Sequence, residues 1–151
     1  MNADRMNRAR RRVLGSRRGA AALEFAIIGT ALMLLSVGML EYGRLSWTRE
    51  ALQSVAIEGA RCMGVQAPSC ATAGVYSSSV TTTFLTNEAA AIGIGLTAAS
   101  FTLNRSATCG SIGGFSQVSI AYSFQTAAPS LLPGLGSGFN LAAQACFPNQ
   151  S

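Results

Sequence analysis

The sequence predicts an α+β protein in which a long N-terminal transmembrane helix continues into a small exported domain with a second helix and a three-stranded antiparallel sheet. Residues 25–40 form an uncharged apolar run, and apolar residues recur at helical spacing from residue 45 to 63. Three strand candidates lie within residues 100–147, and two of them alternate apolar and polar residues, as half-buried strands do.

The charges of the chain are concentrated at its N-terminus. Only 11% of the 151 residues are charged, and all eleven basic residues are arginine. Seven arginines and Asp4 give residues 1–19 a net charge of +6, whereas the remainder carries −1. An arginine-rich N-terminus also occurs in proteins that bind nucleic acid. Because an apolar run follows directly, we expect a membrane segment with a cytoplasmic N-terminus instead, and no nucleic-acid partner.

The apolar run is long enough to span a bilayer. With residues 20–24 it reaches about 21 residues, interrupted only by Glu24, and a helix of about 20 residues crosses the hydrocarbon core. A cleaved secretory signal would need a small-residue site after the run, but the sequence EYGRLSW follows. A buried core helix would leave the arginine-rich flank unexplained. We therefore expect one membrane-spanning helix with the C-terminal part exported.

The segment RRGAAALEF, residues 17–25, stands at the start of this run. Two arginines, a glycine, four small or apolar residues, a glutamate and an aromatic residue in this order resemble the cleavage site of type IV prepilins. In that family a membrane aspartyl peptidase cuts after the glycine. The resemblance implies cleavage between Gly19 and Ala20, loss of the basic leader, and a mature chain whose fifth residue is Glu24.

Glu24 is an unusual residue in an apolar segment. A charged side chain inside the bilayer costs about 2.5–3.5 kcal/mol on insertion scales, so this carboxylate needs a partner or a purpose. A free α-amino group on a neighbouring subunit would serve once the leader is gone. The prepilin resemblance implies that Glu24, followed by Phe25, sets the register between subunits. The alternative is that Glu24 lies at headgroup level, where a negative charge suits the helix N-terminus.

The resemblance continues beyond the apolar run. It includes a juxtamembrane motif and further small and charged residues: Glu41, Tyr42, Gly43 and Arg44, then Ala51, Leu52 and Ala56, then Glu58, Gly59, Ala60 and Arg61. With the cleavage site, these residues resemble the N-terminal region of TadE-like proteins, which are minor pseudopilin-like components of the tight-adherence (Flp/Tad) pilus system. The TadF and TadG types share the same anchor.

This TadE-like resemblance covers roughly residues 17–61. It implies a bacterial inner-membrane protein with a periplasmic C-terminal domain that can enter a surface pilus. The implied partners are a prepilin peptidase, other pilin-like subunits and the Tad secretion machinery.

The helix is expected to continue outside the membrane. We divide the chain into a leader, a transmembrane helix, its extramembrane continuation and an exported α+β domain, at residues 1–19, 20–42, 43–66 and 67–151. In the continuation, apolar or small residues form one stripe: Leu45, Thr48, Leu52, Val55, Ala56, Gly59, Cys62 and Met63. This stripe would pack against the C-terminal domain of the same chain or against a partner subunit.

The elements of the exported domain are predicted from breakers and alternation. A second helix is expected at residues 73–94, ended by Gly93 and Gly95. The strands are expected at residues 100–104, 117–124 and 139–147, with a turn at residues 109–114 and a longer loop at residues 129–138.

Four cysteines are expected to staple this small domain. In an oxidising compartment they form two disulfides with three possible pairings. We favour Cys62–Cys70, which closes a loop at the helix end, and Cys109–Cys146, which ties the strands. A zinc site is the alternative, but the chain has no histidine and no Cys-x-x-Cys pair. No metal and no cofactor are expected.

No catalytic residue is predicted. Without histidine the chain lacks the usual proton shuttle near neutral pH, and no nucleophile, base and orienting residue occur together. An anchored enzyme is therefore the weakest interpretation. The leading one is a structural subunit of pilus assembly, and the alternative is a single-pass anchored binding or adhesin protein that never enters a pilus.

Overall fold

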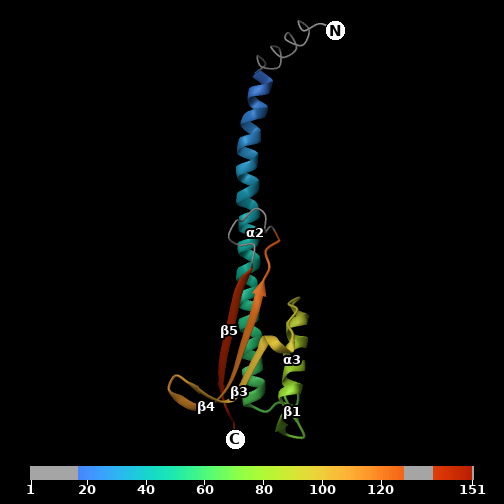
Figure 1. The fold of residues 1–151 in the computed structure, drawn as a ribbon, viewed down its shortest axis with the longest axis vertical. Coiled ribbons are helices and arrows are strands. Elements are labelled where there is room, and N and C mark those ends of the chain that lie inside the picture. Colours follow the sequence, from blue (N-terminus) through green and yellow to red (C-terminus); the bar gives the residue numbers. More distant parts are fainter. Residues whose placement is uncertain (1–16, 128–137, 151) are drawn as a thin grey trace. The chain divides into compact units, whose positions relative to one another are not determined.

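The structure, a computed structural model, describes residues 17–127 and 138–150. Most of the expected leader and nearly all of the expected loop at residues 129–138 lie outside these ranges. The chain forms two compact units, which meet in the sequence between Tyr42 and Gly43. Figure 1 shows the elements of both units.

The first unit contains the N-terminal part of helix α2, which runs from Arg17 to Gly64. Alanine and leucine, both good helix formers, are frequent here, and the first proline of the chain is residue 68. Thr30 and Ser36 donate their hydroxyl groups to the carbonyl oxygens of Ala26 and Leu32, at 2.7 and 2.8 Å. These polar groups are thus satisfied within the helix, as an apolar environment requires.

The apolar side chains of this unit are exposed. In the part of the chain that the structure describes, one helical segment, Gly19–Gly64, is long and apolar enough to cross a membrane, and its most apolar stretch has no buried residue. Leu23, Phe25 and Met39 are each more than half exposed. Apolar surface of this extent is unfavourable in water, so the segment favours an apolar surrounding.

The second unit combines the C-terminal part of α2 with a second helix and two sheets. The elements after α2 are β1 (Ala71–Thr72), β2 (Val75–Tyr76), α3 (Ser78–Ala91), the 3-10 turn η1 (Ala98–Ser100), β3 (Phe101–Cys109), β4 (Ile112–Phe124) and β5 (Phe139–Pro148). Strands β1 and β2 form a hairpin, and β3, β4 and β5 form an antiparallel sheet in that order. The predicted α+β class, with a second helix and a three-stranded sheet, is confirmed.

The core of the second unit is formed by α2, α3 and the three-stranded sheet (Figure 1). Alternate residues of β4, including Val118 and Ile120, are buried, as the alternation in the sequence predicts. The predicted stripe of α2 joins the same core, and all of its members except Leu45 are buried. The stripe therefore packs within its own chain.

Gly59 allows α2 and α3 to approach each other closely. A Cβ atom at this position would lie 2.5 Å from Leu85 Cδ2 and 3.3 Å from Val118 Cγ2. Leu85 and Val118 are both 0% exposed, so neither side chain can move aside into solvent. A residue without a side chain is therefore required where α2, α3 and β4 meet.

The prediction placed the start of the second helix too early. Helix α3 begins at Ser78 and not at residue 73, because Ala73 and Gly74 have positive φ angles of 52° and 78° and form the turn between β1 and β2. The predicted end is closer, since α3 ends at Ala91 and Gly93 follows with a φ of 77°.

The three predicted strands are present, and two are longer than expected. Strand β3 continues to Cys109 and β4 begins at Ile112. The expected turn at residues 109–114 therefore shrinks to Gly110 and Ser111, both of which have positive φ.

Both predicted disulfides are present. Cys62–Cys70 joins the end of α2 to the loop before β1, with Cα atoms 5.9 Å apart. Cys109–Cys146 joins the end of β3 to β5, with Cα atoms 6.6 Å apart. Because all four cysteines are paired, no thiolate is available for the zinc alternative.

Gly59→Ala is expected to lower the free energy of unfolding by about 1–3 kcal/mol, because the added methyl group overpacks the contact with Leu85. Gly43→Ala is the matched control on the same helix, since nothing lies within 4 Å of a Cβ atom there. Thermal and urea unfolding of the full chain in detergent measures both variants. Equal stability of the two variants would contradict the close approach of α2 and α3.

Candidate functional site

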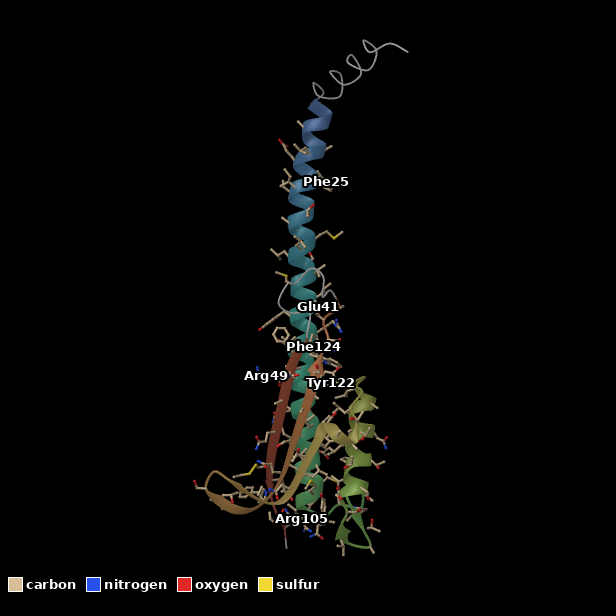
Figure 2. The ribbon with its side chains drawn as sticks, in the orientation of Figure 1. Phe25, Glu41, Arg49, Arg105, Tyr122 and Phe124 are labelled. Atoms are coloured by element: carbon tan, nitrogen blue, oxygen red, sulfur yellow. A yellow bond between two sulfur atoms is a disulfide. The ribbon has the colours of Figure 1, made fainter. Side chains whose placement is uncertain are left out.

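The candidate site is the segment of α2 that carries the predicted processing and recognition residues. Gly19 and Ala20 lie close to the first described residue of α2, Arg17. Glu24 and Phe25 follow about one turn later, and both are exposed. Phe25, which is labelled in Figure 2, is 78% exposed. The predicted residues therefore lie near one another on an accessible stretch of helix.

Glu24 is surrounded by apolar neighbours. The nearest positions on the same helix face are 20, 21, 27 and 28, which are two alanines and two isoleucines. Its carboxylate makes no hydrogen bond or ion pair with any residue that the structure describes. Water can solvate such a carboxylate, whereas a bilayer cannot. In a membrane Glu24 would therefore need a partner from outside the described chain.

The juxtamembrane motif is divided between the two units. Glu41 and Tyr42 end the first unit, and Tyr42 is 71% exposed. Gly43 and Arg44 begin the second, in which the guanidinium carbon of Arg44 lies 5.5 Å from the centroid of the Phe124 ring. This cation–π contact joins the start of the second unit to the end of β4. This contact could not be predicted from the sequence, because no local pattern links residues so far apart.

The charged and small residues of the segment Glu58 to Arg61 serve different purposes. Gly59 and Ala60 are buried in the core of the second unit, whereas Glu58 and Arg61 are exposed. Leu52 and Ala56, which belong to the same resemblance, are also buried. The small and apolar residues of the TadE-like resemblance therefore serve packing inside the second unit.

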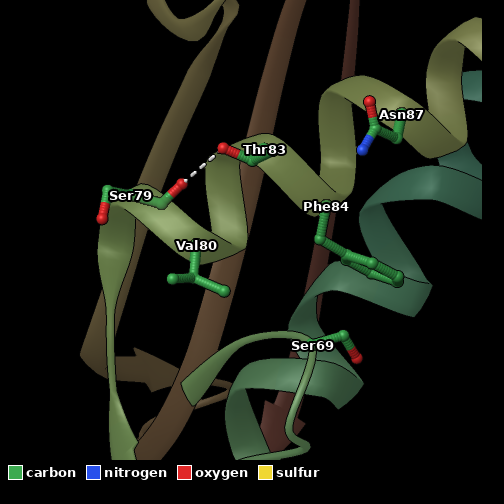
Figure 3. Close-up of a pocket in the computed structure, with 6 residues that line it drawn as sticks. All are labelled: Ser69, Ser79, Val80, Thr83, Phe84 and Asn87. Atoms are coloured by element: carbon green, nitrogen blue, oxygen red, sulfur yellow. Dashed lines mark hydrogen bonds between the residues drawn. The ribbon is translucent and has the colours of Figure 1, made fainter. Parts of the chain in front are cut away.

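A shallow surface depression of about 400 Å³ lies over α3 (Figure 3). Its lining consists of small, polar and apolar side chains: Ser69, Ser79, Val80, Thr83, Phe84 and Asn87. The hydroxyl of Thr83 donates to the carbonyl oxygen of Ser79 at 3.0 Å, which fixes its orientation. No titratable group lines the depression, so it supplies neither acid nor base. Within residues 17–127 and 138–150, no group of three or more metal-ligating side chains occurs.

A cluster around Arg105 connects the hairpin, the sheet and the C-terminal residues. Its guanidinium carbon lies 5.6 Å from the centroid of the Tyr76 ring, and the guanidinium donates to the side-chain oxygen of Gln66. The Asn149 amide donates to the carbonyl oxygen of Arg105 at 2.8 Å and accepts from the Ser116 hydroxyl at 2.6 Å. Burial raises the pKa of Tyr76, although the charge of Arg105 opposes this. These contacts fasten separate elements to one another.

The stability of the second unit is expected to fall as pH rises above 10. Tyr76 has a higher pKa in the folded chain than its ordinary value of 10.0, so its contribution is complete below pH 10 and is lost as pH rises through the folded value. Tyr76→Phe should reduce this alkaline loss, and Tyr122→Phe serves as the control for removing a hydroxyl. Unfolding midpoints on both sides of pH 10 measure the effect. An unchanged alkaline loss in Tyr76→Phe would show that Tyr76 is not its source.

The fold and the exposed site define a protein with one apolar N-terminal helix that continues into the core of a small α+β unit. A family model described as TadE-like protein matches residues 19–61. The match begins at the predicted processing glycine and ends at Arg61, so it confirms the TadE-like resemblance over less than a third of the chain. It also associates the chain with Tad/Flp pilus systems and with a structural family. No curated protein and no solved structure matches the chain.

Proposed function

We propose that this chain is a minor pseudopilin-like component of Flp/Tad pilus biogenesis, anchored in the inner membrane by α2 and processed by a prepilin peptidase between Gly19 and Ala20. The observation that carries the proposal is Glu24, an exposed carboxylate on an apolar helix that has no partner among the described residues. The TadE-like match over the same segment supports the pilus context.

Two features support an N-terminus inside the cytoplasm and a second unit outside it. The arginines precede the apolar segment, and basic residues beside a membrane helix mark its cytoplasmic side. Both disulfides lie in the second unit, and disulfides persist in oxidising compartments such as the periplasm. The two features are independent of each other and favour the same orientation.

Processing at this position would keep the anchor attached. A cut after Gly19 removes a leader with a charge of +6 and leaves the apolar part of α2 joined to the second unit. It also creates a positively charged α-amino group on Ala20. In an apolar surrounding this amine and the Glu24 carboxylate of a neighbouring subunit would neutralise each other, which removes the cost of both charges.

The surface left for assembly is the apolar part of α2 in the first unit. The stripe from Thr48 to Met63 is buried in the core of its own chain, so it cannot also bind another subunit. By contrast, nearly all described side chains from residue 19 to 40 are exposed. Contacts with other pilin-like subunits would therefore use the segment that includes Glu24 and Phe25.

In cells with a prepilin peptidase, the mature chain is expected to begin at Ala20, because the peptidase recognises Gly19 next to the apolar helix. Gly19→Val should block the cut, since a branched side chain replaces the small residue at the scissile bond. Gly15→Val, another glycine of the leader, is the matched control and should still be processed. Mass spectrometry of the purified chain measures the N-terminus. A chain that keeps Met1 in peptidase-containing cells would contradict the proposal.

Glu24→Ala is expected to remain in the membrane fraction and to abolish assembly with other pilin-like subunits, because the carboxylate that pairs with their α-amino groups is lost. Glu24→Gln should fail in the same way, since it keeps the size but not the charge. Glu50→Gln, an exposed glutamate later in α2, is the control. Pilus counts and co-purification of subunits measure assembly. Normal assembly by Glu24→Ala would favour the alternative, an anchored binding or adhesin protein outside the pilus.

A further inference from the structure

We infer that one end of the second unit rests on the headgroup layer of the membrane, with two aromatic side chains in contact with lipid. We call this surface the aromatic end and define it by Arg44, Trp47, Phe124 and Phe139, all of which belong to the second unit. The inference depends on the proposed anchoring of α2 and goes further, because it assigns a lipid-binding surface to the folded unit itself.

The length of the connecting chain keeps the start of the second unit near the bilayer. The unit begins at Gly43, and the uncharged apolar run ends at Leu40. Three residues span at most about 10 Å even when fully extended, and the headgroup layers add about 10–15 Å in total to a hydrocarbon core of about 30 Å. Gly43 and Arg44 therefore lie in the headgroup layer or directly beside it.

The contact between Arg44 and Phe124 places the end of β4 close to the start of the second unit. The guanidinium carbon of Arg44 lies 5.5 Å from the Phe124 ring centroid, and Figure 2 shows Phe124 beside α2. Phe124 pairs with Phe139 at the end of the register between β4 and β5. Phe139 is thus held close to the start of the second unit. Trp47 lies three residues after Arg44, about one turn along the helix.

The distribution of exposed aromatic residues favours lipid as the partner. Of the aromatic side chains described in the second unit, Trp47 and Phe139 are the exposed ones, at 57% and 42%. Both belong to the aromatic end. Tryptophan is enriched at the headgroup level of membranes, where its ring is apolar and its N–H group remains hydrated. A bilayer surface next to Gly43 would therefore cover the side chains that the fold leaves in water.

Trp47 is the only tryptophan of the chain, so its fluorescence reports on this surface alone. The full chain is reconstituted in vesicles of phosphatidylethanolamine and phosphatidylglycerol that carry a spin label either on the headgroup or deep in the acyl chain. The headgroup label is expected to cause the larger loss of Trp47 emission. The emission maximum should also lie at shorter wavelength than that of the same chain unfolded in urea without lipid.

Two variants move the reporter to other positions. Trp47→Phe with Phe139→Trp keeps it at the aromatic end, and the same headgroup-label quenching is expected. Trp47→Phe with Ile112→Trp moves it to the opposite end of β4, about 40 Å along the strand at the usual rise per residue. Ile112 is 65% exposed, so a tryptophan there should be tolerated. Its emission should be insensitive to both labels.

Flotation of the same vesicles separates this inference from the proposed anchoring. The chain can float with the vesicles while tryptophan at positions 47 and 139 is quenched no more than tryptophan at position 112. In that case the aromatic end does not touch lipid and the inference is wrong, but the proposed anchoring stands. The same absence of quenching is expected if the aromatic end binds another subunit and not lipid, because the vesicles contain only this chain. If the chain does not float, both the anchor and the inference are overturned.

Discussion

One helix has to satisfy two different surroundings, and the rest of the structure follows from this constraint. Before Leu40, α2 exposes apolar side chains on all sides, and its hydroxyl groups bond back to its own carbonyl oxygens. From Thr48 onward it buries a single stripe against α3 and the sheet. The first arrangement suits a bilayer or an apolar subunit core. The second is that of an amphipathic helix in a water-exposed domain.

The TadE-like segment covers both parts of this helix, and its residues have different physical roles. Gly59 has no side chain at the point where α3 and β4 approach α2 closely, and Ala60 is buried in the same core. Glu24 has no packing role in the described chain, since it is exposed and has no partner there. A carboxylate that the fold does not use and that a membrane disfavours is best explained by a contact made after assembly.

The elements with a regular pattern could be predicted from the sequence, and those that depend on distant contacts could not. Alternation along β4 and helical spacing along α2 follow from burial on one face, so a half-buried strand at residues 117–124 and an apolar stripe that includes Leu52 could be predicted. The hairpin before α3 was missed because Ala73 adopts a positive φ angle that alanine does not signal. The contact of Arg44 with Phe124 and the cluster around Arg105 join residues far apart in the chain, where no local pattern exists.

The central claim, that Glu24 meets the new α-amino group of a neighbouring subunit, is tested most directly by a photo-crosslinking amino acid that replaces Ile28, one helical turn after Glu24, in cells that assemble pili, so that the carboxylate itself is kept. Mass spectrometry then identifies the residue to which position 28 is joined. The account predicts crosslinks to the first residues of a processed pilin-like subunit. Crosslinks to lipid alone, in cells that carry complete pili, would contradict it.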